Sequence, residues 1–258
     1  MSKISGAIHE FQTIDGMATK DQWMNRIHPL VKFALTIFYI ILVVSFPKYD
    51  LAGLIRFMVY PVVLFIIGDI AFWDSLRRIR VVLLLVCVVG ILNPFFDRSV
   101  IGTIGSVTIT GGMVSMLTLM LKSILSVLAS YLLIATTSIE KICYAMRLLH
   151  IPKLFTTQIL LIYRYISVLM IEAERITQAY ALRAPKQKGV HFKVWGSLVG
   201  LLLFRSMDRA EDIYESMCLR GYQGEFTYGN RLKCRGADWL YLLIWLVLLV
   251  VLRSDLLV

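Results

Sequence analysis

Residues 113–136 read MVSMLTLMLKSILSVLASYLLIAT, a run of 24 residues in which Lys122 is the one charged side chain. A helix of about 20 mainly apolar residues is long enough to cross the hydrocarbon core of a bilayer. This stretch is therefore predicted to be a transmembrane helix, which makes the chain an integral membrane protein.

The composition of the whole chain agrees with this prediction. Of its 258 residues, 58% are hydrophobic and 17% are charged, whereas soluble domains are about 45–50% apolar and roughly a quarter charged. A disordered protein is excluded, and a water-soluble enzyme is strongly disfavoured. The net charge of the chain is +10. Because charged side chains are unfavourable inside a bilayer, most of the basic residues should lie outside the apolar segments.

Further apolar runs lie between charged borders on both sides of this stretch. We expect an all-α membrane protein with five spans, at roughly 30–47, 51–69, 80–96, 113–136 and 238–253. Several runs are shorter than a full span, but flanking Lys and Trp side chains can extend them to the membrane interface. The external loop after the third span (96–112, FDRSVIGTIGSVTITGG) is rich in β-branched residues and glycine, and it predicts a small hairpin-like cap.

The distribution of Lys and Arg predicts the orientation of these spans. The segments 1–32, 70–80 and 137–236 hold four, three and fifteen of the 27 basic residues, 22 together. Loops that are rich in Lys and Arg stay on the cytoplasmic side. We therefore expect a cytoplasmic N-terminus and an external C-terminus. The opening 28 residues have no apolar core typical of a signal peptide.

The expected organisation follows from these segments. It comprises a cytoplasmic N-terminal segment (1–29), four transmembrane helices (30–136), a cytoplasmic helical region (137–236) and a final transmembrane helix (237–258). The cytoplasmic region contains two apolar stretches, 154–171 and 194–204. Arg164 interrupts the first and the second has only eleven residues, which favours re-entrant, interfacial or groove-buried helices. Two additional spans stay open, so the count is five to seven.

The two helical stretches that follow end in a repeat. AERITQAYALRA (173–184) aligns with AEDIYESMCLRG (210–221), with identical residues at the Glu174/Glu211, Leu182/Leu219 and Arg183/Arg220 positions. Small residues, Ala184 and Gly221, follow the two arginines. An arginine at a helix end beside small neighbours can pair with a carboxylate in a partner's groove. The alternative is that each arginine only complements its helix dipole, but the repeat favours docking.

These residues resemble a known family. The short Leu182-Arg183-Ala184 and Leu219-Arg220-Gly221 motifs are similar to those of the T component of energy-coupling factor transporters. Ala184 followed by Pro185 departs from the glycine often found in the first motif. Further similarity to the CbiQ-type cobalt permeases lies in Ile14-Asp15, 27–32 (IHPLVK), 93–98 (NPFFDR), Ile151-Pro152, 163–166 (YRYI) and 172–175 (EAER).

The resemblance implies a bacterial or archaeal cell-membrane protein and a mechanism. Two cytoplasmic coupling helices would dock on two ABC-type ATPase subunits, anchored by Arg183 and Arg220, with Glu174, Glu211 and Arg164 in support. Their motion would reach a separate substrate-binding membrane subunit. Apolar residues would pack against that subunit or the membrane surface, namely Ile159, Ile162, Ile166, Leu169, Val199, Leu202 and Leu203.

Signals for chemistry in the chain itself are weak. The sequence has no G-x-x-x-x-G-K-[ST] phosphate loop, so ATP hydrolysis is expected in the partners. Catalytic residues and cofactors are not expected, and the carboxylates form no obvious catalytic pair. A metal site is not expected, because the histidines are scattered (His9, His28, His150, His191). The carboxylates at Asp208, Glu211, Asp212 and Glu215 could bind a cation, but a solvated face pairing with Arg205 and Arg209 is favoured. The four cysteines, Cys87, Cys143, Cys218 and Cys234, are expected to be free thiols.

Lys122 stays open between a role in transport and an ammonium that reaches the interface. Three functions are weighed. The first is the coupling scaffold of an ATP-driven cobalt importer, or of a nickel or vitamin importer of the same type. The second is a membrane-embedded lipid-modifying enzyme, disfavoured by the lack of an Asp-rich metal motif. The third is a self-contained channel or carrier, disfavoured by the scarcity of intramembrane charges. Nucleic acid is not an expected partner.

Overall fold

The structure is a computed structural model of the chain. It describes residues 23–68, 100–104, 107–185, 189–224 and 234–254, with single residues or short pieces between them. The chain forms two compact units, each described by itself. The bundle unit comprises Ala18–Ser138 and Leu232–Val258, and the long-helix unit comprises Met1–Met17 and Ile139–Arg231.

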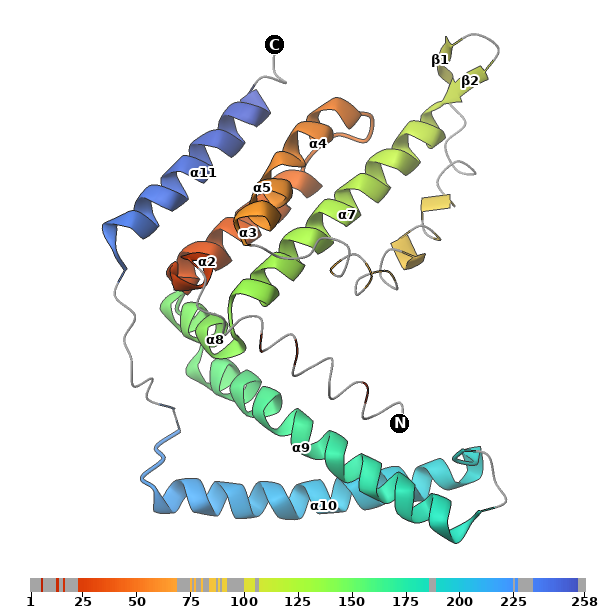
Figure 1. Ribbon diagram of the computed structural model, residues 1–258, viewed down its shortest axis with the longest axis vertical. Coiled ribbons are helices and arrows are strands. Elements are labelled where there is room, and N and C mark those ends of the chain that lie inside the picture. The colour runs from red at the N-terminus through yellow and green to blue at the C-terminus, as the bar shows by residue number, and fades with distance from the viewer. Residues whose placement is uncertain are drawn as a thin grey trace. The chain divides into compact units, whose positions relative to one another are not determined.

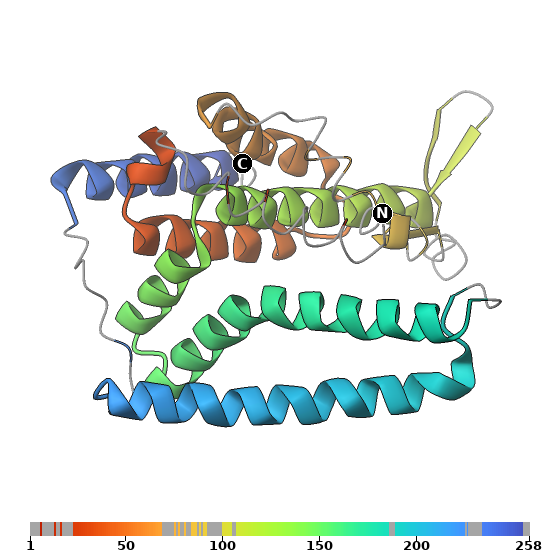
Figure 2. The ribbon, with the colours of Figure 1, turned by 60° about the horizontal axis from the view of Figure 1, so that its bottom comes forward.

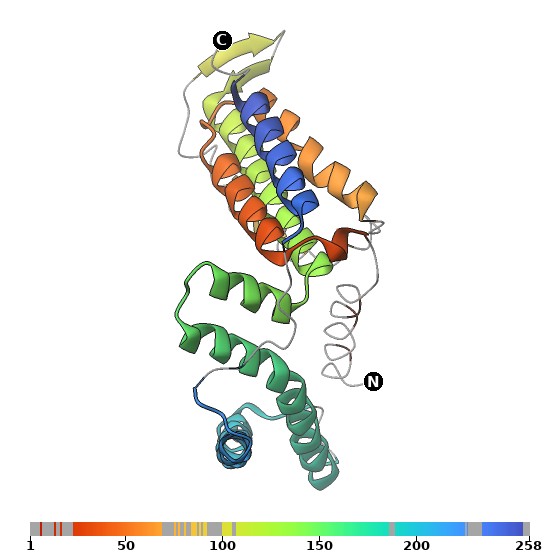
Figure 3. The ribbon, with the colours of Figure 1, turned by 90° about the vertical axis from the view of Figure 1, so that its left-hand side faces the viewer.

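Three helices of the bundle unit lie side by side (Figures 1 and 3), α3 (Pro29–Val44), α7 (Gly111–Thr136) and α11 (Gly236–Ser254). α3 packs against both α7 and α11. The short α2 (Trp23–Arg26) precedes α3, while α4 (Leu51–Phe57) and α5 (Val59–Ile67) pack against α7. Apolar side chains from all these helices meet around Leu35, Leu54 and Leu125, which are almost inaccessible to solvent.

The buried positions of α7 recur every three or four residues, as expected for one face of a helix. Small residues occupy part of that face, including Ser115, Thr118 and Ala129, and such residues allow membrane helices to approach closely. Two buried threonines of α7 bond to carbonyls of their own helix: Thr118 and Thr136 each donate to the residue four positions earlier, at 2.8 Å. These two hydroxyl groups are thus satisfied without water.

The break between α4 and α5 follows from a proline. Pro61 has no N–H to donate to the carbonyl oxygen of Phe57, four residues earlier. The Tyr39 hydroxyl of α3 donates to that oxygen instead, at 2.9 Å. Tyr39 also stacks on Tyr60 with ring centroids 4.3 Å apart, and Tyr60 meets Trp245 of α11 edge-on at 4.9 Å. An aromatic layer thus joins α3, α5 and α11.

The helices confirm an all-α membrane protein and correspond to four of the five expected spans. The fifth, 80–96, lies mostly outside the described residues, although those described there, such as Leu84, Leu85 and Ile91, are helical. A two-stranded antiparallel hairpin, β1 (Val100–Ile104) and β2 (Val107–Thr110), matches the expected cap and leads directly into α7 (Figure 3).

Length and composition alone would allow three of the described helices to cross a membrane, α7, α11 and α9 (Lys153–Arg183). α3 and the α4–α5 pair are apolar but shorter. α9 belongs to the long-helix unit. Because it is long and apolar enough to cross a membrane, the expected number of spans stays at five to seven. Its assignment to the interface stays a prediction.

The long-helix unit is a hairpin of two helices with a shorter one beside it. α8 (Ile139–Leu148) packs on α9, and α9 runs antiparallel to α10 (Phe192–Leu219), as Figure 2 shows. α9 ends at Arg183 before Ala184-Pro185, and α10 begins after His191, whose side chain accepts a hydrogen bond from the Lys193 N–H at 3.4 Å. α10 has no buried residue, so most of its surface is available to a partner or a membrane.

Candidate docking site on the long helices

The two repeated arginines lie at the ends of the two long helices. Arg183 is the last residue of α9, and Arg220 is the C-cap residue of α10. Both side chains are exposed, and the leucine before each is among the most exposed of the large apolar residues: Leu182 at 83% and Leu219 at 91%. Each helix end therefore presents a cation beside an exposed apolar side chain.

The antiparallel arrangement separates these two ends. Arg183 adjoins the connection that leads into the start of α10, while Arg220 lies at its far end. α10 has 28 residues, which at 1.5 Å per residue is about 42 Å. The repeat thus produces two separate ends rather than one cluster of arginines.

The end of α10 is built on Gly221. The N–H of Tyr222 donates to the Met217 carbonyl at 3.0 Å, and the N–H of Gly221 donates to the Cys218 carbonyl at 2.9 Å. This is the Schellman arrangement, which needs a residue in the left-handed region. Gly221 has φ +81°, a conformation that costs an L-residue with a side chain about 1–2 kcal/mol.

The end of α9 is built differently. Its C-cap is Ala184, with φ −127°, and the Ala184 N–H donates to the Tyr180 carbonyl at 3.0 Å. Pro185 follows and cannot continue the helix. Ala184 and Gly221 are equivalent in the repeat, yet only Gly221 is left-handed.

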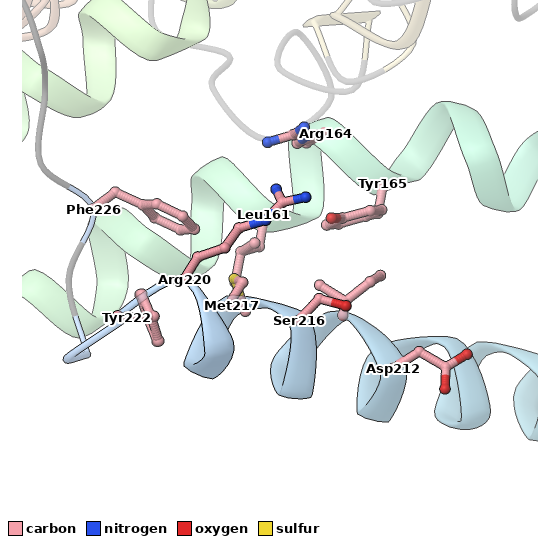
Figure 4. A pocket seen from close by; sticks show the side chains of 11 residues that line it. Leu161, Arg164, Tyr165, Asp212, Ser216, Met217, Arg220, Tyr222 and Phe226 are labelled. Atoms are coloured by element: carbon pink, nitrogen blue, oxygen red, sulfur yellow. The ribbon is translucent and has the colours of Figure 1, made fainter.

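A cavity of about 400 Å³ lies beside Arg220, between α9 and α10 (Figure 4). Arg164 and Tyr165 line it from α9, and Asp212 and Arg220 line it from α10. Arg164 was expected only in a supporting role, and the structure brings it to the same cavity as Arg220. Arg183 lies at the other end of the hairpin.

The remaining supporting residues have different settings. Glu211 is exposed on α10, and Glu174 is half-buried on α9. The ion pair that joins the two helices is formed instead by Glu172 and Arg205, with Arg175 3.6 Å from the other oxygen of Glu172. This pair was not anticipated from the sequence, since Arg205 was expected to pair within α10.

Lys122 occupies a position that neither interpretation of the sequence anticipated. Its Nζ donates to the carbonyl oxygens of Val44, at 3.2 Å, and Phe46, at 2.5 Å. The Val44 carbonyl lies at the C-terminal end of α3, where a helix has unpaired acceptors and a partial negative charge, and the Phe46 carbonyl follows two residues later. In the described structure Lys122 therefore holds two helices of the bundle together.

Other candidate groups have ordinary structural settings. His28 and His191 cap helices, whereas His9 and Cys87 lie outside the described residues. The three described cysteines are free thiols. Within the described part of the chain, no group of three or more His, Cys, Asp or Glu side chains is placed to hold a metal ion.

Comparison with known proteins gives the family. Residues 20–228 match the family model described as CbiQ, cobalt transport protein. The chain belongs to the CbiQ family. The match includes both arginine motifs and every described helix except α11. As a CbiQ family protein, the chain is a membrane-embedded cobalt transport protein.

A relative from Methanocaldococcus jannaschii, "Uncharacterized protein MJ1571", is 25% identical over 219 residues, which is 81% of this chain and 75% of that protein. Its name assigns no activity or partner. This relative therefore gives no further information on the function of the chain.

Proposed function

We propose that this chain is the transmembrane coupling subunit of an ATP-driven cobalt importer. Two ABC-type ATPase subunits dock on its long-helix unit, and a separate membrane subunit binds the metal ion. The chain itself is not an enzyme, and ATP hydrolysis takes place in the ATPase subunits. Membership of the CbiQ family supports the transport role.

The placement of the repeated arginines carries the docking part of this proposal. One arginine and one exposed leucine stand at each end of a helical pair about 42 Å long. Two such ends suit two copies of a partner better than one compact binding site. An arginine offers bidentate, oriented pairing to a carboxylate, and the leucine adds apolar contact.

The exposed apolar residues of the long helices support the second contact. Ile162 is 56% exposed on α9, and Val199 and Leu203 are 54% and 58% exposed on α10. Exposed apolar surface of this extent marks contacts with proteins or membranes. We assign these residues to the substrate-binding subunit or the membrane surface.

The orientation is part of the proposal. The long-helix unit and the N-terminus face the cytoplasm, where ATP is available, and the C-terminus lies outside. The 22 basic residues of the three cytoplasmic segments support this arrangement.

The test is charge reversal at both arginine ends. R183E/R220E is expected to lose co-purification with the ATPase subunits while the protein stays in the membrane, since both side chains are exposed. R175E/R209E is the matched control, because it makes the same charge change on the same two helices away from their ends. It is expected to retain the complex.

Complex formation by R183E/R220E equal to that of the unmodified protein would refute the docking sites. Hydrolysis of ATP by the purified chain alone would refute the proposal that the ATPase subunits carry out this reaction. Uptake of radioactive cobalt into cells that express the whole system tests the substrate, and uptake of nickel or a vitamin in its place would reassign it.

A further inference from the structure

The cavity at the end of α10 contains an uneven set of charges. Arg164 and Arg220 contribute two guanidinium groups, and Asp212 contributes one carboxylate. Within the described residues, the structure records no ion pair for either arginine. In Figure 4 the Arg220 side chain extends from α10 toward α9, where Arg164 lies. The cavity is thus left with an excess of one positive charge.

The walls of this cavity are held in place. The Schellman turn at Gly221 directs Tyr222 back over α10, and its ring lies 5.3 Å from that of Phe226. The carbonyl oxygen of Phe226 accepts a hydrogen bond from Arg147 of α8 at 3.0 Å. Two segments of the chain and α8 therefore fix the aromatic wall.

The charges and the wall specify the group that fits. Two guanidiniums can share one carboxylate, and charge-assisted hydrogen bonds of this kind are short and strong. The aromatic and apolar wall of Leu161, Met217, Tyr222 and Phe226 suits an apolar side chain adjoining that carboxylate. The cavity volume of about 400 Å³ is large enough to hold a carboxylate side chain and the apolar side chain beside it.

We propose that Arg164 and Arg220 together bind a single carboxylate of the ATPase subunit that docks at the end of α10. This inference rests on the proposed function and deepens it. The two docking ends are then unequal. The α10 end has a second arginine and a preformed cavity, whereas at the α9 end Arg183 stands exposed beside Ala184. The ATPase subunit at α10 is bound more tightly.

The test is a double-mutant cycle on affinity for the purified ATPase subunits. The full chain is placed in nanodiscs of neutral phosphatidylcholine, and binding is measured for R164Q, R220Q, R183Q and the pairs R164Q/R220Q and R164Q/R183Q. R164Q and R220Q are each expected to weaken binding about tenfold or more, as for the loss of a charged hydrogen bond. R175Q is the matched control on α9 and is expected to leave affinity unchanged within about twofold.

The pairs decide whether the two arginines share one group. R164Q/R220Q is expected to depart from the product of its single effects by about fivefold or more, and R164Q/R183Q to equal its product within about twofold. If R220Q weakens binding and R164Q does not, or if R164Q/R220Q is multiplicative, this inference is wrong and the docking function stands. If R183Q and R220Q both leave affinity unchanged, the proposed function fails with it. An effect of R164Q confined to discs with anionic phosphatidylglycerol would identify a lipid phosphate as the occupant and overturn the proposal.

Discussion

Helices α3 and α10 differ most in how the fold uses them. α3 buries Val31, Leu35 and Tyr39 almost completely, whereas α10 buries no residue at all. Helices gain most of their stability from packing an apolar face. α3 is therefore stabilised by packing in the bundle, whereas α10 packs mainly on α9 among the described helices and leaves most of its surface exposed. Substitutions should accordingly affect stability in α3 and assembly in α10.

The ends of α3 strengthen this contrast. At its start, the His28 N–H donates to Asp238 of α11 at 3.2 Å, and Lys32 Nζ donates to the Thr136 carbonyl of α7 at 2.9 Å. At its end, Lys122 binds two carbonyls, and an Arg253 nitrogen donates to the Leu42 carbonyl at 3.2 Å. Bonds between side chains and backbone thus join both ends of α3 to α7 and α11.

The largest expected effect comes from Asp238→Ala. Asp238 is buried and accepts hydrogen bonds from the His28 N–H and, at 2.8 Å, from the Arg235 N–H. Its removal takes the shared acceptor from both N–H groups in a buried setting, which we expect to destabilise the bundle by about 3 kcal/mol. The measurement is the apparent unfolding midpoint in detergent, with Asp208→Ala on exposed α10 as the control, expected within about 0.5 kcal/mol. Equal midpoints for the two variants would remove the contrast between the helices.

Lys122→Met is expected to have a smaller effect of the same kind. The variant loses two hydrogen bonds from Nζ to the end of α3, a cost of about 1–2 kcal/mol, while the methionine keeps the apolar part of the side chain. Lys193→Met at the exposed start of α10 is the control and should leave the midpoint unchanged. Loss of cobalt uptake by Lys122→Met at full stability would show instead that Lys122 acts in transport.

The sequence predicted the helices better than the bonds between them. Apolar runs of the right length indicate spans because a bilayer excludes unpaired backbone, and four of the expected spans appear as apolar helices or helix pairs. The break at Met58 was not expected, although Pro61 was its signal. Asp238 and Arg253 were taken as the borders of a span, since a sequence does not show which helix lies beside which.

The arginine ends show the same limit. The repeat made Arg183 and Arg220 equivalent, because identical residues predict identical local structure. The structure separates them through one difference, Ala184 against Gly221, and through Arg164, which lies 56 positions before Arg220 in the chain. The antiparallel packing of α9 on α10 brings Arg164 to the same cavity as Arg220. The sequence repeat contains no information on that packing.

A more local effect is expected from Gly221→Ala, which tests the end of α10 alone. Alanine at φ +81° costs about 1–2 kcal/mol, so the last turn should open and the amides of Cys218 to Tyr222 should exchange hydrogen faster. Gly196→Ala is the matched control, because an added Cβ there meets nothing within 4 Å. Alanine inside a helix is favoured over glycine by up to about 1 kcal/mol, so this control should slow exchange. The same sign for both variants would contradict the assigned turn.

Glu140→Gln is expected to leave stability unchanged. It tests instead the difference between a buried cysteine and an exposed one. Burial raises the pKa of the Cys143 thiol in α8, and the nearby Glu140 carboxylate raises it further. Only the thiolate reacts with alkylating reagents, so a higher pKa means less thiolate at neutral pH and slow labelling. The labelling rate of Cys143 should reach half its maximum at a higher pH than that of free cysteine, while Cys218, exposed on α10, should be labelled first. Glu140→Gln removes the second cause and should shift the Cys143 profile to lower pH with the protein still folded. A profile that Glu140→Gln leaves unmoved would show that burial alone sets the reactivity of Cys143.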